Sequence, residues 1–205
     1  MMDSRSRKWT ITGIVSLVAV PAAMAVTGQA PAAHARTRPA APVAQVSSSA
    51  RTNMSYALYK ARGGRITTGF DGYVHTPGRH EGIDFARRLN APVHSLVNGK
   101  IIYIARGGTG RAGLSTISIY IAYLRKTVIY LHTAPLRTLR TGQSVRHGQV
   151  IAVESWHGVK DRPSAHTHVE MRPGWHKHAA DSTHDDRLDN PNPGPFWNSL
   201  GYNVR

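Results

Sequence analysis

The chain has 205 residues, a length that suits one folded domain once a targeting segment is set aside. Its formal net charge of +15 is typical of proteins that adhere to polyanions. Its basic residues are not interleaved with aromatic residues in any nucleic-acid-binding pattern, so we expect no nucleic-acid partner. The sequence contains no cysteine, which excludes disulfides and leaves histidine and carboxylate side chains as its strong metal ligands.

The first 35 residues follow the order of a secretory signal. A basic stretch at residues 5–8 precedes an apolar run at residues 9–26, and the triplet Ala33-His34-Ala35 has the small residues of a cleavage site. We therefore predict a secreted, cell-wall-associated protein with no stable membrane span after cleavage. Residues 1–35 carry a net charge of +2 (three basic residues against one Asp), so their removal leaves +13. An uncleaved membrane anchor is the alternative, and it would also place the domain outside the cytoplasm.

Residues 36–53 are rich in Pro, Ala, Ser and Arg without apolar periodicity, as expected of a disordered linker. We predict that one folded domain spans residues 54–205. In this domain short apolar runs alternate with turn residues, and no stretch has a convincing helical period. The sequence therefore predicts a mainly β fold, a single domain built on antiparallel sheets with few or no helices. The predicted strands are Tyr56–Lys60, Arg65–Thr68, Pro92–Val97, Lys100–Ala105, Thr116–Leu124, Lys126–His132, Val150–Val153 and His166–Met171.

The clearest hairpin joins two of these runs. Ile117, Ile119 and Ile121 alternate with smaller or more polar residues, and the next run follows a tight link at Arg125-Lys126. The tail after Pro173 is polar and ends in a segment rich in Pro and aromatic residues, which we expect to pack over an open edge of the sheet.

Three histidine-bearing segments indicate a metal-dependent chemistry. The first has the pattern H-x-x-x-D (His80 and Asp84), the second is Tyr130-Leu131-His132, and the third is His166-Thr167-His168. On a strand the two histidines of the third segment point to the same face, roughly 7 Å apart, and Gly82 permits a bend that would bring His80 and Asp84 together. Two imidazole nitrogens and one carboxylate oxygen, with a fourth position open to water, are typical of a catalytic zinc site. Taken alone, His132 is more typical of a strand-end histidine with a structural hydrogen bond.

Together, these segments resemble the lysostaphin/LytM-type zinc metalloendopeptidases, which cleave bacterial peptidoglycan. The resemblance covers about residues 64–172. It implies a LytM/lysostaphin-like fold, the zinc ligands His80, Asp84 and His168, and catalytic acid–base roles for His132 and His166, which match family positions that bind no metal. The motifs that carry it are Gly64-Arg65-Ile66-Thr67-Thr68-Gly69-Phe70, His80-Glu81-Gly82-Ile83-Asp84-Phe85-Ala86, Ala91-Pro92-Val93, Asn98-Gly99-Lys100-Ile101, Tyr130-Leu131-His132, Thr141-Gly142-Gln143-Ser144-Val145, Gly148-Gln149-Val150-Ile151, His166-Thr167-His168-Val169-Glu170 and Leu188-Asp189-Asn190-Pro191.

The chain departs from the family pattern at two places. Asn90 stands where a Gly is usual, and asparagine can adopt the left-handed turn that this position needs. Residues 156–165 lack the usual glycine-rich loop, and we expect this segment to border the cleft and to affect substrate preference. A further group of His and Asp residues lies at residues 176–186. We interpret it as a solvated loop, with a second metal site as the alternative.

The resemblance implies a secreted zinc-dependent metalloendopeptidase that acts on peptidoglycan peptides. We expect a monomer, and the basic charge adds anionic wall polymers as possible partners. The alternative is a catalytically inactive cell-wall-binding or regulatory module on the same fold, because fold does not fix function. Such modules typically lack metal ligands. Zinc D-alanyl-D-alanine peptidases are a further alternative, but they typically have a longer His-to-Asp spacing and a Glu-x-x-His pair.

Overall fold

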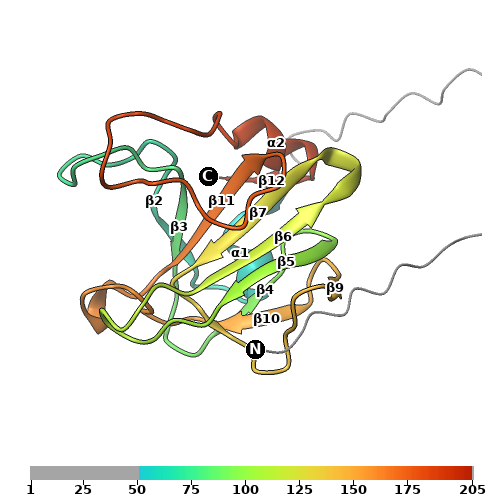
Figure 1. The fold of residues 1–205 in the computed structure, drawn as a ribbon, viewed down its shortest axis with the longest axis horizontal. Helices are drawn as coiled ribbons and strands as arrows, with labels where there is room; N and C mark the ends of the chain where they lie inside the picture. Colours follow the sequence, from blue (N-terminus) through green and yellow to red (C-terminus); the bar gives the residue numbers. More distant parts are fainter. Residues whose placement is uncertain (1–50, 205) are drawn as a thin grey trace, which may run out of the picture. The chain divides into compact units, whose positions relative to one another are not determined.

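A computed structural model describes residues 51–204 (Figure 1). The predicted signal (residues 1–35) and nearly all of the predicted linker (residues 36–53) lie outside the described residues. Thr52 and Asn53, at the end of the predicted linker, form a short strand. No helix in residues 51–204 has the length and apolar character needed to cross a membrane.

The elements, in chain order, are mainly short strands. They are β1 (Thr52–Asn53), α1 (Met54–Tyr59), β2 (Arg65–Thr68), β3 (Gly82–Ala86), β4 (Pro92–His94), β5 (Gly99–Ala105), β6 (Thr116–Ile121), η2 (Ala122–Leu124), β7 (Lys126–Leu131), β8 (Ala134–Pro135), β9 (Ser144–Val145), β10 (Val150–Val153), η3 (Arg162–Ser164), β11 (Thr167–Pro173), α2 (Gly194–Ser199) and β12 (Tyr202–Asn203).

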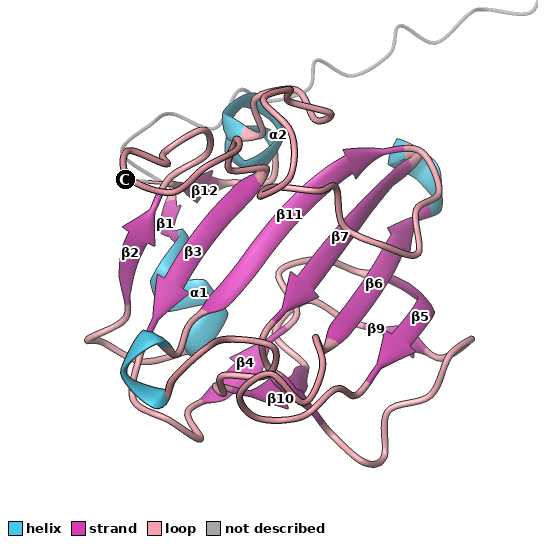
Figure 2. Ribbon diagram, turned by 60° about the vertical axis from the view of Figure 1, so that its left-hand side comes forward, coloured by secondary structure: helices cyan, strands magenta, loops and turns pink. Residues whose placement is uncertain are grey.

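A seven-stranded antiparallel sheet dominates the fold, in the order β2-β3-β11-β7-β6-β5-β9. Figure 2 shows its long central strands side by side. A three-stranded sheet, β4-β10-β8, and the parallel pair β1-β12 complete the strands of the described part. The predicted mainly β, antiparallel fold with few helices is confirmed.

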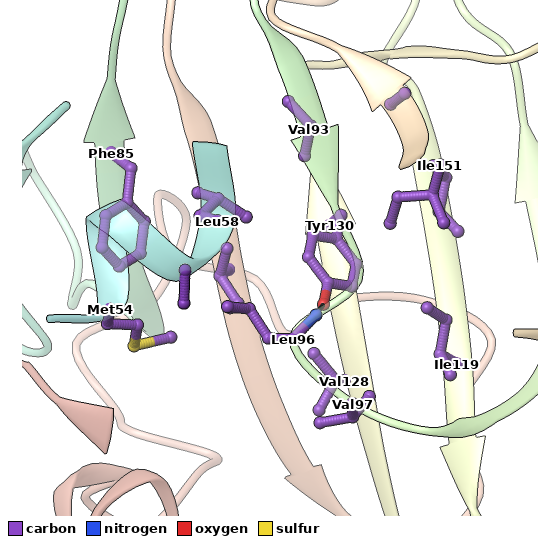
Figure 3. Close-up of a cluster of buried hydrophobic side chains, with 14 of the residues drawn as sticks. Met54, Leu58, Phe85, Val93, Leu96, Val97, Ile119, Val128, Tyr130 and Ile151 are labelled. Atoms are coloured by element: carbon purple, nitrogen blue, oxygen red, sulfur yellow. Dashed lines mark hydrogen bonds between the residues drawn. The ribbon is translucent and has the colours of Figure 1, made fainter. Parts of the chain in front are cut away.

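The core lies against one face of the seven-stranded sheet. Alternate residues of the strands, such as Ile119, Val128 and Val169, are fully buried there. Burying such a side chain fully contributes roughly 1.5–3 kcal/mol to folding. Figure 3 shows Tyr130 within this cluster, with its hydroxyl group directed at the backbone of Leu96, whose N–H donates to it over 2.8 Å. The hydroxyl group of this buried side chain therefore has a hydrogen-bond partner.

The first predicted strand is wrong, because residues 54–59 form the helix α1. Asn53 accepts a hydrogen bond from the N–H of Tyr56 through its side chain and caps the helix. Met54, Ala57 and Leu58 are buried at helical spacing, so the segment packs one face on the core. The cap and this spacing are the signals that the sequence-based prediction missed.

The other predicted strands match observed ones within a few residues, except that Pro92–Val97 shortens to β4. The β6–β7 hairpin is present, and its link contains the 3₁₀ turn η2 followed by Arg125 in a left-handed conformation (φ 51°). Strand β3 was not predicted as a strand. Gly82 begins it rather than forming a bend.

The C-terminal tail does not simply pack over an open sheet edge. The Ser118 hydroxyl donates to the carbonyl of Lys177 over 2.7 Å, so the segment after β11 crosses the outer face of the sheet. The tail then forms α2, whose Phe196 and Trp197 join the core. The tail residues that contact the outer face of the sheet therefore lie between residues 177 and 190.

Candidate active site

Strand register places the third histidine segment beside the first motif. On neighbouring strands β11 and β3, His168 is paired with Asp84, and Thr167 is paired with Phe85. Thr167 and Phe85 are fully buried on the core side. Because side chains alternate along a strand, His168 and Asp84 therefore share the outer face. His166 precedes β11 by one residue and shares the side of His168, as the sequence predicts.

His80 reaches the same point from the segment before β3. Its Nδ1 lies 2.6 Å from the carbonyl oxygen of Gly69, which can only accept, so Nδ1 carries the proton and Nε2 keeps a lone pair. This Nε2 lies 3.1 Å from Oδ1 of Asp84 and 3.0 Å from Nδ1 of His168. All three ligand atoms lie within 4.8 Å of one another, and all three residues are buried. The structure thus brings together the three predicted metal ligands.

The electrostatics of this cluster favour a bound cation. Burial alone would raise the pKa of Asp84, but the adjacent imidazoles of His168 and His80 hold it well below its ordinary value. Burial alone would lower the pKa of His168, but its hydrogen bond with Asp84 and the nearby carboxylate of Glu170 raise it to about 9. The protein therefore stabilises a positive charge between these groups, which a metal ion can supply in place of a proton. Two nitrogens and one carboxylate oxygen fit the donor set of zinc.

Two further residues hold His168 in place. Glu170, fully buried, lies with Oε2 3.6 Å from Nε2 of His168, on the ring edge that faces away from Asp84. Its Oε1 accepts hydrogen bonds from the N–H of Ala180 and from Asn190. Carboxylates that contact the second nitrogen of a metal-binding imidazole orient the ring and raise its basicity. A Cβ added at Gly82 would lie 2.5 Å from the same Nε2, so only glycine leaves room for the ring.

The two predicted catalytic histidines face each other beside the ligands. The rings of His132 and His166 lie 4.5 Å apart, and Nε2 of His166 lies 3.8 Å from Oδ1 of Asp84. In each ring Nδ1 donates to a backbone carbonyl, that of His157 for His132 (2.9 Å) and that of Ser164 for His166 (2.8 Å). The neutral form of each ring therefore carries its lone pair on Nε2.

His132 is held in its neutral form. Burial, and then the neighbouring His166, lower its pKa to about 3, so the ring is neutral near pH 7. Its backbone is left-handed (φ 66°), an uncommon conformation that often marks functional positions. The N–H of His157 donates back to the carbonyl of His132 over 3.1 Å. These two reciprocal hydrogen bonds fix the segment after residue 156 to the end of β7.

A cleft with two lobes runs past these groups. One lobe, of about 490 Å³, is lined by His168 and by residues 178–184 of the tail. The other, of about 840 Å³, is lined by Asp84, β2 and residues 158–160 and 163–166. Tyr73, His132 and His166 line both lobes and so stand at their junction. Residues of the 156–165 segment therefore border the cleft, as predicted. Asn90 has φ 61°, the left-handed turn expected of it.

The sequence-based prediction missed Tyr73 and gave Glu170 no role. The Tyr73 ring stacks on His80 with centroids 4.8 Å apart, and burial, followed by the charge of Asp84, raises the pKa of its hydroxyl group. It therefore stays protonated and can donate a hydrogen bond into the cleft. No sequence motif marked it.

Within residues 51–204, the cluster of His80, Asp84 and His168 is the one group of this kind placed to hold a metal, and the His and Asp residues at 176–186 do not form another.

Comparisons with known proteins agree with this geometry. The model of peptidase family M23 matches residues 78–181, which span just over half of the chain and contain all five predicted site residues. The structure of LytU is 29% identical in sequence and covers 66% of this chain and 86% of its own, with a TM-score of 0.49. The antimicrobial peptidase lysostaphin from Staphylococcus simulans is 22% identical, with a TM-score of 0.50 over 69% of this chain and 52% of its own, which supports the fold. The chain therefore belongs to peptidase family M23.

Proposed function

We propose that this protein is a zinc endopeptidase that hydrolyses peptide bonds in bacterial peptidoglycan outside the cytoplasm. The observation that carries the proposal is the convergence of His80 Nε2, Asp84 Oδ1 and His168 Nδ1 within 4.8 Å, next to two further histidines on an open cleft. Family membership supplies the peptidase class. The substrate and the secretion are inferred from the sequence resemblance and from the signal-like N-terminus.

The residues divide the chemistry between them. A zinc ion held by the three ligands would supply Lewis-acid activation of a water molecule and of the peptide carbonyl. His132, neutral near pH 7 and with Nε2 free, suits the general base that takes the proton of the attacking water. His166 presents its Nε2 beside Asp84 and suits proton transfer to the leaving amine. The Tyr73 hydroxyl group can donate a hydrogen bond to the developing oxyanion.

The alternative of an inactive wall-binding module is less well supported by the geometry. Such a module needs no open cleft beside a metal site. Here both His132 and His166 line the cleft. In each ring Nδ1 donates to a backbone carbonyl, and this hydrogen bond fixes the tautomer. The arrangement is that of groups placed to transfer protons.

The test combines metal analysis with digestion of purified peptidoglycan. His168→Ala should lose most of its zinc. His132→Ala and His166→Ala should keep zinc and lose about 10²- to 10⁴-fold in turnover each, the usual contribution of a general acid or base. His176→Ala, whose ring bonds to the carbonyl of Pro173 outside the cleft, is the matched control and should behave as the parent.

New amino termini identified by mass spectrometry would show which bond is cut. If the parent protein carries zinc but releases no new amino termini from any wall preparation, the proposed activity is wrong. Parental turnover in His132→Ala would remove that residue from the catalytic group.

A further inference from the structure

The two lobes of the cleft differ in charge. The lobe of about 840 Å³ is lined by two cations, Arg65 on β2 and Lys160 in the segment before β11. Both residues are exposed. The one carboxylate that lines this lobe is Asp84, which is committed to His80 and His168.

Neither cation is held in a direct ion pair, although the charge of Lys160 helps to lower the pKa of the neighbouring Asp161. Within residues 51–204, the side chains of Arg65 and Lys160 form no ion pair and no hydrogen bond. Asp161 follows Lys160 in sequence, but its Oδ1 accepts the N–H of Ser164 in its own turn and it does not line the cleft. The remaining polar groups of the lobe include the threonines at 67, 68 and 76, which are neutral. The lobe therefore presents unpaired positive charge.

The other lobe has the opposite character. It is lined by no Lys or Arg, and it contains the carboxylate of Asp181. Hydrogen bonds from the N–H of Thr183 and from His184 hold the pKa of Asp181 below its ordinary value, so this carboxylate stays ionised. Between the lobes stand Tyr73, His132 and His166. A peptide bound across these groups therefore meets positive charge on one side of its scissile bond and not on the other.

We propose that the lobe bounded by Arg65 and Lys160, the cationic lobe, is a subsite for a free carboxylate of the substrate. This inference rests on the proposed function and deepens it. The preferred substrate is then a wall peptide with an ionised carboxylate on one side of the scissile bond, rather than an uncharged glycine-rich cross-bridge. Arg65 offers a planar fork of donors that fits a carboxylate, and Lys160 offers a mobile point charge.

The expected effect is moderate, because both cations are exposed. Exposed ion pairs contribute about 0.2–1 kcal/mol each, which for two pairs corresponds to roughly 2- to 30-fold in kcat/KM. Because both cations contact a part of the substrate that does not react, the change should appear in KM and leave kcat near the parental value. Added salt should reduce the preference.

The experiment compares two synthetic cross-linked stem peptides that differ only in one group, a free carboxylate or a carboxamide on the residue next to the scissile bond. A glycine-rich peptide of equal length is the third substrate. The zinc-loaded parent should have the lowest KM for the carboxylate peptide. The double variant Arg65→Gln/Lys160→Gln should lose that preference while keeping its zinc and its circular dichroism spectrum.

The matched control is Lys100→Gln/Arg146→Gln. It removes the same charge from exposed residues at β5 and just after β9, across the sheet from β2 (Figure 2). It should keep the preference for the carboxylate peptide. A shift of equal size in this control would show a general charge effect and overturn the subsite.

Equal KM values for the carboxylate and carboxamide peptides in the parent, or faster cleavage of the glycine-rich peptide, would also overturn the subsite and leave the proposed function standing. If the parent cleaves none of the three peptides and releases nothing from peptidoglycan, the proposed function fails, and the inference fails with it.

Discussion

Replacement of Gly82 by alanine should separate metal binding from general stability. The added Cβ would lie 2.5 Å from Nε2 and 2.7 Å from Cε1 of His168, and 2.6 Å from the carbonyl oxygen of Val169. Real Cβ atoms do not approach neighbours so closely, so strand β11 or the imidazole must shift. Overpacking of this kind costs typically 1–3 kcal/mol. Displacement of a metal-binding ring adds a loss of affinity of about 10- to 100-fold, by analogy with changes in the outer shell of metal sites.

Gly99→Ala is the matched control for this prediction. Its Cβ would lie 2.6 Å from a side-chain carbon of Ile119 and 2.6 Å from the carbonyl oxygen of Tyr120, a similar clash on a strand that carries no predicted site residue. Denaturant unfolding with a chelator present should show a comparable loss of stability in both variants. Zinc titration should show weaker binding only in Gly82→Ala. If the two variants bind zinc equally well, the contact between Gly82 and His168 does not control the metal site.

Three further predictions follow from the buried carboxylates and the net charge. Glu170→Gln should keep the fold but lower zinc affinity about 10- to 100-fold, because a neutral amide no longer places a negative charge 3.6 Å from Nε2 of His168, and isothermal titration would measure the loss. Burial raises the pKa of Glu154 from 4.5 to about 7, so the folded state binds its proton more tightly than the unfolded state does. The stability that this adds is present below pH 4.5 and is lost as the pH rises through 7. Chelator-treated parent protein should therefore lose more stability than Glu154→Gln between pH 5 and pH 8, and identical pH profiles would contradict the argument. Binding to intact sacculi should weaken as salt rises past about 0.1 M, whereas cleavage of a small uncharged peptide should change far less, and sacculus binding that is constant with salt would assign the basic charge another role.

Much of the site could be predicted from the sequence because its parts lie on strands. The two-residue period of β11 requires His166 and His168 to share a face, and the motif resemblance pairs them with His80 and Asp84. The helix α1 was missed because six residues give a weak period, and the sequence was interpreted by β propensity rather than by its Asn53 cap. Tyr73 could not be predicted, since its contact with His80 depends on a loop whose path no local pattern encodes. The charge difference between the lobes likewise depends on segments far apart in the sequence, at residues 65, 160 and 181.

Three of the site's imidazoles, those of His80, His132 and His166, are oriented by main-chain oxygens and not by side chains. Every amino acid has a carbonyl group, so the side chains of Gly69, His157 and Ser164 are not what sets the tautomers. The loops that surround the reacting groups can therefore exchange residues, provided that their backbone path is kept, while the proton-transfer chemistry stays the same. The amino-acid sequence of these loops is therefore less constrained than their backbone path. This is consistent with a 156–165 segment that differs from the glycine-rich loop of the resembled family beside five retained site residues that were predicted from the sequence.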